Sequence, residues 1–122
     1  NNHKFISLFY RIILQIVYNA SIPIECEIGN NLYLPHGFNC IFLSKYSKIG
    51  DNCTIYHNVT IGSVNDKAPI IKNNVLIGTG AILLGEVTIG ANSKIGAGSI
   101  VVKDVPPNST VIPNSSSIRW LY

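Results

Sequence analysis

The sequence has no methionine, one tryptophan and few charged residues, which make up only 12% of its 122 positions. So little charge, together with 47% hydrophobic residues, excludes a disordered chain and indicates one domain with a packed core. The chain starts at Asn1 without a methionine. We interpret it as a fragment or a processed chain, so N-terminal targeting is unreadable.

Long hydrophobic runs are also absent. The longest, residues 5–18, contains Arg11 and Gln15 and falls short of the roughly 20 residues that span a bilayer. Its apolar residues nearly surround it, so we expect a helix that packs against a neighbouring subunit, a preceding N-terminal domain or a membrane surface. A peripheral membrane contact is one of these alternatives.

The charged residues and the cysteines limit the partners and the cellular compartment that we expect. Nine lysines and arginines are scattered without a basic run or interleaved aromatics, so we expect no nucleic-acid partner. Cys26, Cys40 and Cys53 have no C-x-x-C spacing and leave one cysteine unpaired in any disulfide scheme. We therefore expect a cytoplasmic protein, and no metal site.

A branched aliphatic residue recurs at every sixth position, a period that fits neither a helix nor an exposed strand alone. These positions are Ile71, Ile77, Leu83, Ile89, Ile95 and Val101 in the last block, Ile49, Ile55 and Ile61 in the middle one, and Ile22, Ile28 and Leu34 in the first. The fifth residue of each hexad, such as Val75, Ala81 or Ser93, is small or medium-sized. This alternation predicts a triangular parallel β-helix in which Cys26 and Cys53 pack at corners.

Two breaks interrupt the hexads. About four extra residues lie in 62-GSVNDKAPI-70, which we expect to form a polar loop with Pro69 at its exit. Three more lie between Leu34 and Ile49. Extrusions from a solenoid usually map to a binding face.

Two segments resemble a known family. The run 76-LIGTGAILLGEVTIGANSKIGAGSIVVKDVPPNS-109 resembles the hexapeptide-repeat acyltransferases. The run 34-LPHGFNCIFLSKYSKIGDNCTIYHNVTIG-62 is similar to the serine O-acetyltransferase-like branch, which includes the cysteine-pathway enzyme and acetyltransferases of capsular and exopolysaccharide sugars.

The resemblance implies an all-β fold, a left-handed parallel β-helix with about three hexads per coil. It also implies a homotrimer with active sites between subunits. We expect an N-terminal helical segment over residues 1–19 and the β-helix domain with its C-terminal tail over residues 20–122.

The resemblance also places the catalytic base. In the family this base is the histidine of an Asp-His pair, which here is Pro35-His36, so only the histidine is kept. Two acidic residues of the family fall on Ser21 and Ser44, and the Arg-His pair that grips serine falls on Lys67-Ala68. A site for serine cannot lose these groups and still select it, so we expect an uncharged sugar hydroxyl as the acceptor.

The imidazole of His36 suits the proton transfer that attack by a hydroxyl on a thioester requires. His57 lies 21 residues later at the same outward third position of a hexad, so the two can be neighbours on one face. We interpret His57, Asn39 and Lys67 as acceptor-binding residues. Asn39 or a backbone carbonyl is a candidate to orient the His36 imidazole, and a backbone N–H is the expected oxyanion donor.

The donor implied by the family is acetyl-CoA. Small residues in the turns allow its extended arm to approach the main chain. By resemblance, the cofactor-binding residues are Gly78, Thr79, Ala97 and, near the nucleotide phosphates, Lys103. Small residues are also required by the repeat itself.

The chain is thus predicted to be an acetyl-CoA-dependent O-acetyltransferase that acts on a free or lipid-linked sugar in capsular or exopolysaccharide biosynthesis. Serine O-acetyltransferase and a non-catalytic scaffold are the alternatives. A metal enzyme of the γ-class carbonic anhydrase type is disfavoured, because His36 and His57 lack the close spacing of its ligands.

Overall fold

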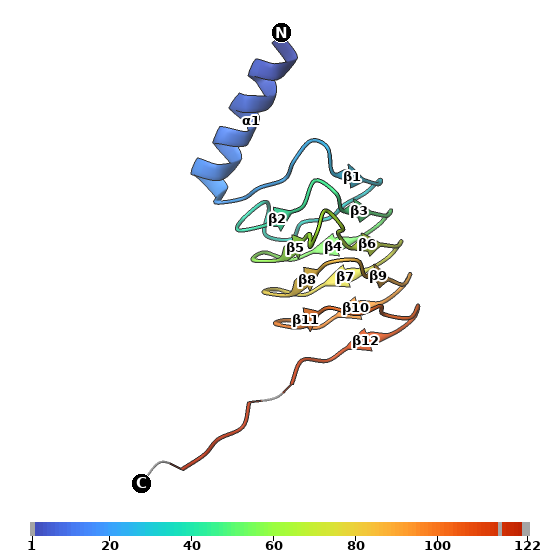
Figure 1. Cartoon of the computed structure of the whole chain (residues 1–122). Coiled ribbons are helices and arrows are strands. Elements are labelled where there is room, and N and C mark those ends of the chain that lie inside the picture. The colour runs from blue at the N-terminus through green and yellow to red at the C-terminus, as the bar shows by residue number, and fades with distance from the viewer. Residues whose placement is uncertain (1, 115, 121–122) are drawn as a thin grey trace.

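The computed structural model describes residues 2–114 and 116–120, as one helix followed by a triangular β-solenoid (Figure 1). Helix α1, Asn2–Tyr18, is followed by Asn19, whose φ of 48° is left-handed and ends the helical hydrogen bonding. The last turn of α1 packs on the first coil through Leu14, the one buried residue of the helix.

The rest of α1 has little contact with the solenoid. Phe5, Ile6, Ile16 and Val17 are more than half exposed, as expected from apolar residues that surround the helix. That a neighbouring subunit, a preceding domain or a membrane surface covers these side chains stays a prediction. Within the described ranges, no helix has the length and hydropathy needed to cross a membrane.

Short parallel strands form three sheets, one along each side of the solenoid. The β1 face contains β1 (Glu27–Ile28), β3 (Lys48–Ile49), β6 (Ile70–Ile71) and β9 (Thr88–Ile89). The β4 face contains β4 (Thr54–Ile55), β7 (Leu76–Ile77), β10 (Lys94–Ile95) and β12 (Thr110–Val111). The β2 face contains β2 (Phe42–Leu43), β5 (Thr60–Gly62), β8 (Ile82–Leu84) and β11 (Ile100–Val101). The predicted left-handed parallel β-helix is confirmed.

The pairing register shows the length of each coil. Ile77 pairs with Ile95, three hexads further along the chain. Ile28 pairs with Ile49, and Ile61 with Leu83, which are three and four residues beyond three hexads. Both predicted extrusions therefore leave the register intact. The first is the turn over residues 35–40, and the second is a hairpin closed by the bridge between Val64 and Lys67, after which Pro69 is fully buried.

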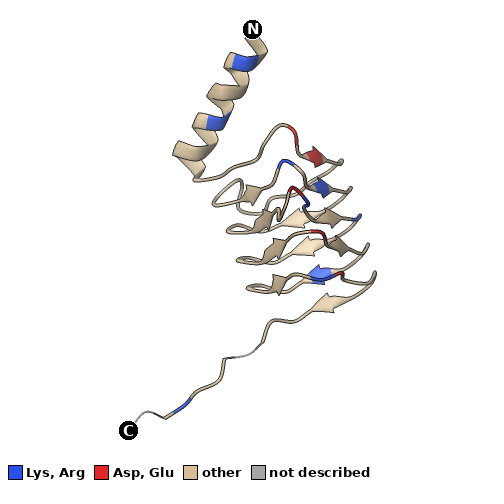
Figure 2. Ribbon diagram, viewed as in Figure 1, with Lys and Arg blue, Asp and Glu red and all other residues tan. Residues whose placement is uncertain are grey.

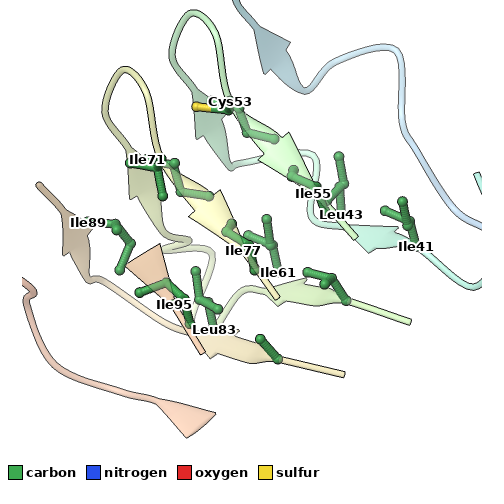
Figure 3. Close-up of a cluster of buried hydrophobic side chains, with 14 of the residues drawn as sticks. Ile41, Leu43, Cys53, Ile55, Ile61, Ile71, Ile77, Leu83, Ile89 and Ile95 are labelled. Carbon is green, nitrogen blue, oxygen red and sulfur yellow. The ribbon is translucent and has the colours of Figure 1, made fainter. Parts of the chain in front are cut away.

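The hexad aliphatics fill the interior (Figure 3). Ile55, Ile77, Leu83, Ile89 and Ile95 have no exposed surface. Ile28 was expected inside but is 38% exposed, because it belongs to the first coil and only Ile49 stacks on it. Leu43 and Ile41 were not among the predicted core positions. They restart the register directly after the first extrusion and are also buried.

The fifth hexad positions pack inside the corners, as predicted. Cys26 and Cys53 are buried free thiols. Burial raises the pKa of both thiols, against the lowering effect of a hydrogen bond to Ser47 for Cys26 and to backbone groups for Cys53. These two thiols are therefore packing groups that resist ionisation.

The corner between the β1 and β4 faces carries an asparagine in the left-handed conformation in successive coils. Asn52, Asn74, Asn92 and Asn108 have φ values of 56° to 62°. Their amides stack, with Nδ2 of Asn74 donating to Oδ1 of Asn92 at 3.1 Å and Nδ2 of Asn92 donating to Oδ1 of Asn108 at 3.2 Å. We call this the asparagine corner.

Candidate active site

The two histidines of the solenoid share one corner with two predicted cofactor residues. His57, Thr79 and Ala97 lie in the turns that lead from β4 to β5, from β7 to β8 and from β10 to β11, and His36 lies in the turn before β2. These turns are the left-hand tips of the coils in Figure 1. We call this edge, between the β4 and β2 faces, the histidine corner.

The rings of His36 and His57 are in contact. Their centroids are 4.7 Å apart and their planes are inclined by 76°, an edge-to-face arrangement. The side chain of His36 is exposed and that of His57 is half-buried, while Tyr56 lies 6.1 Å from His36 between ring centroids. The prediction that the two histidines are stacked neighbours is confirmed.

Thr79 holds His57 from the coil below. Its Oγ1 donates to the carbonyl oxygen of His57 at 2.9 Å and lies 3.2 Å from Nε2 of the same residue. The other ring nitrogen, Nδ1, is buried and has no hydrogen-bond partner among the described residues. Thr79 was predicted only as a cofactor-binding residue. Its position, three hexads and four residues after His57, indicates that the two lie in adjacent coils, but it gives no information about this side-chain contact.

Asn39 does not have the predicted role of orienting the His36 imidazole. Its Nδ2 donates to the backbone carbonyl of His36 at 2.7 Å, and the backbone carbonyl of Asn39 accepts from the N–H of Asn58 at 3.2 Å. The amide therefore stabilises the turn over residues 35–40 and does not hold the imidazole of His36. A contact between Asn39 and the acceptor stays a prediction.

No charged residue lies in the four turns of the histidine corner, residues 35–40, 56–59, 78–81 and 96–99. The tips of these coils carry neither blue nor red in Figure 2. All six acidic residues of the chain lie elsewhere, at positions 25, 27, 51, 66, 86 and 104. The site presented by one chain is therefore neutral apart from the histidines.

Lys67 and Lys103 lie at a different corner, between the β2 and β1 faces. Nζ of Lys67 forms an ion pair with Oε2 of Glu86 at 2.8 Å, which ties the hairpin to the next coil, although both side chains are largely exposed. Lys103 lines a hollow of about 270 Å³ together with Val102 and Ser109. Within one chain, neither lysine lies at the histidine corner.

The glycines of the histidine corner are of two kinds. A Cβ added to Gly78 would lie 2.6 Å from the backbone nitrogen of Ala97, so this glycine is required by the stacking of coils. Gly80 and Gly98 have left-handed φ values of 71° and 73° and nothing closer than 3.9 Å to an added Cβ. They leave the backbone of the lower histidine corner uncovered, as an extended ligand would require.

The corner presents two imidazoles and neutral hydrogen-bonding groups, the kinds of group that acyl transfer to a hydroxyl uses. In residues 2–114 and 116–120, no group of three or more His, Cys, Asp or Glu side chains is arranged to hold a metal ion.

Comparisons with known proteins agree with this fold. The family described as bacterial transferase hexapeptide (six repeats) matches residues 68–103. The serine acetyltransferase of Bacillus pumilus is 42% identical over 89 residues, which cover 70% of this chain and 41% of that protein. That of Helicobacter pylori is 37% identical over 90 residues, covering 70% and 52%.

Solved structures show the same similarity. Neisseria gonorrhoeae serine acetyltransferase in complex with serine superposes with a TM-score of 0.85 at 34% identity, over 96% of this chain and 49% of that one. Soybean serine acetyltransferase complexed with serine gives a TM-score of 0.78 at 36% identity, over 84% and 44%. The chain thus spans about half the length, or less, of these relatives. By its repeat, its fold and these relatives, the chain belongs to the hexapeptide-repeat transferase family.

Proposed function

We propose that this chain is an acetyl-CoA-dependent O-acetyltransferase in which His36 is the general base. The observation that carries the proposal is the exposed imidazole of His36, packed on His57 at an otherwise neutral corner. His36 takes the proton of the acceptor hydroxyl as its oxygen attacks the thioester carbonyl. The carbon–sulfur bond then breaks, and His36 returns the proton to the sulfur of CoA.

The relatives favour serine as the acceptor. They are named serine acetyltransferases, and two are solved with serine bound. They support the serine alternative of the sequence analysis better than the sugar acceptor, which none of these names mentions. Serine acetylation, and with it a role in cysteine biosynthesis, is therefore the first candidate activity.

A sugar hydroxyl is the second candidate, because of one observation about the site. Serine presents an ammonium and a carboxylate, whereas the histidine corner of one chain has no charged side chain to pair with either. Lys67, at the position of the family's serine-gripping arginine, is engaged with Glu86. An uncharged acceptor needs only neutral hydrogen bonds.

Acetyl-CoA is proposed to lie along the lower histidine corner, where Gly80 and Gly98 leave the backbone open. Lys103, beside a hollow of about 270 Å³, is its proposed phosphate contact. Because Lys67 and Lys103 lie at another corner, their part in the site requires a neighbouring subunit, which fits the homotrimer that we propose. Sedimentation should then show a trimer, and a stable monomer would remove these two lysines from the site.

The test is release of CoA thiol from acetyl-CoA with serine, and with a panel of free and nucleotide-linked sugars, at equal concentrations. Faster release with serine supports the first candidate, and faster release with a sugar supports the second. Absence of acceptor-dependent release, by a protein that binds acetyl-CoA, would contradict the acetyltransferase proposal.

A further inference from the structure

The contacts of Thr79 determine which nitrogen of His57 carries the hydrogen. The oxygen of Thr79 lies 2.9 Å from the carbonyl oxygen of His57, and two oxygens this close require a hydrogen between them. A carbonyl cannot donate, so the single hydroxyl hydrogen of Thr79 lies on this contact. Towards Nε2, at 3.2 Å, the same oxygen can only accept.

Nε2 of His57 is therefore the protonated nitrogen, and in the neutral ring Nδ1 carries the lone pair. That nitrogen is buried and has no partner among the described residues. A buried acceptor without a donor is unfavourable, because it has given up its hydrogen bonds to water and gained none in the protein. The neighbouring ring of His36 is exposed, its centroid lies 4.7 Å from that of His57, and it carries an imidazole N–H group that can satisfy this acceptor.

We propose that His57 is the positioning residue for His36, with its Nδ1 accepting a ring N–H of His36. This inference rests on the proposed function, and it answers how His36 is oriented where Pro35 replaces an aspartate. The bond leaves the other nitrogen of His36 as the free base that faces the acceptor. When His36 takes the hydroxyl proton, the same bond stabilises the imidazolium, while His57 stays neutral and Thr79 keeps its tautomer fixed.

The first test observes the tautomer in the free protein and needs no activity. In protein labelled with ¹⁵N-histidine, long-range ¹H–¹⁵N correlation spectra should show His57 protonated at Nε2, with its signals assigned by their loss in His57→Gln. Thr79→Val combined with His36→Ala removes both partners of the ring and should convert this single tautomer into a mixture, whereas Thr79→Ser should preserve it. A His57 ring protonated at Nδ1, or a single tautomer that persists in the double variant, would overturn the proposal.

The second test is kinetic. His57→Leu has no acceptor and should lower kcat by about 10-fold to 100-fold, by analogy with the partners that orient metal-bound histidines, with little change in the KM of acetyl-CoA. His57→Gln can donate to Thr79 and accept from His36, and should recover most of that loss. Thr79→Val should lower kcat in the same sense, while Thr88→Val, on the β1 face, should not.

The outcomes separate the two proposals. Equal losses in His57→Leu and His57→Gln, with both proteins folded, would overturn the positioning role and favour direct contact with the acceptor. If the protein releases no CoA thiol with any acceptor, the proposed function fails, and the tautomer spectra still decide whether Thr79 and His57 are arranged as inferred.

Discussion

Ile95 on β10 pairs in register with Ile77 on β7, and neither side chain has any exposed surface. The residue before Ile95, Lys94, points outward on the same strand. The two neighbours therefore occupy opposite faces of the strand, Ile95 inside the solenoid and Lys94 outside it.

This contrast predicts opposite costs for adjacent substitutions. Ile95→Ala should lower the free energy of unfolding by about 2 to 5 kcal/mol, because it removes packed methyl groups and leaves a cavity. Lys94→Ala should change it by less than about 0.5 kcal/mol. Urea unfolding followed by circular dichroism measures both, and a similar loss in the two variants would contradict the hexad register.

Much of the solenoid was predictable, because its register depends on a pattern that one chain repeats many times. Ile71, Ile89 and Ile95 occupy the same position of the hexad and the same kind of buried environment. A wrong assignment at one of these positions is therefore corrected by the others. Ile28 was placed wrongly because it lies in the end coil, where a neighbour is missing, and a repeat carries no signal for its own ends.

The asparagine corner predicts a particular order of stabilities. Asn92 has a φ of 62°, which costs alanine about 1 to 2 kcal/mol. Asn92→Ala should lose this amount together with the amide bonds to Asn74 and Asn108, while Asn92→Gly should lose only the bonds. Urea unfolding should therefore rank Asn92→Gly as more stable than Asn92→Ala, and the reverse order would be inconsistent with a strained backbone at this corner.

The thiols should differ in reactivity. Burial raises the pKa of Cys26 and Cys53, whereas Cys40 is only half-buried. Because the thiolate is the reactive form, Cys40 should be modified first by a disulfide reagent in the folded protein at pH 8, with the other two protected until unfolding. Mass spectrometry of partially labelled protein identifies the site, and rapid labelling of Cys53 would contradict its packing role.

The same shifts have a consequence for stability. A thiol whose pKa is raised in the folded state stays protonated after the unfolded chain has ionised, so the unfolded state binds fewer protons. Stability should then fall as the pH rises above about 8.5, the ordinary thiol value. The loss between pH 7 and pH 9.5 should be smaller in Cys53→Ala than in the parent protein, and an equal loss would show that Cys53 does not contribute.

The site was less predictable than the fold. The pairing of His36 with His57 followed from counting residues around one coil. The contacts of Thr79 with His57 did not, because they depend on side-chain rotamers in a turn with no repeating partner. The engagement of Asn39 with the backbone of His36 is equally local, and the hexad pattern gives no information about it.

His36→Ala tests the central claim, that this imidazole is the general base of an acetyl transfer. The side chain is exposed, so the variant should unfold at the same urea concentration as the parent and bind acetyl-CoA with the same Kd. Lys45→Ala, an exposed substitution outside the histidine corner, is the control and should retain full activity.

The most direct measurement is the rate of CoA thiol release by folded His36→Ala, with saturating acetyl-CoA and the best acceptor of the parent protein. We expect kcat to fall by about 10²-fold to 10⁴-fold, the usual contribution of a general base. That fall corresponds to about 3 to 5 kcal/mol of transition-state stabilisation. Retention of more than about a third of the activity, with activity abolished in His57→Ala, would contradict the claim and assign the base to His57.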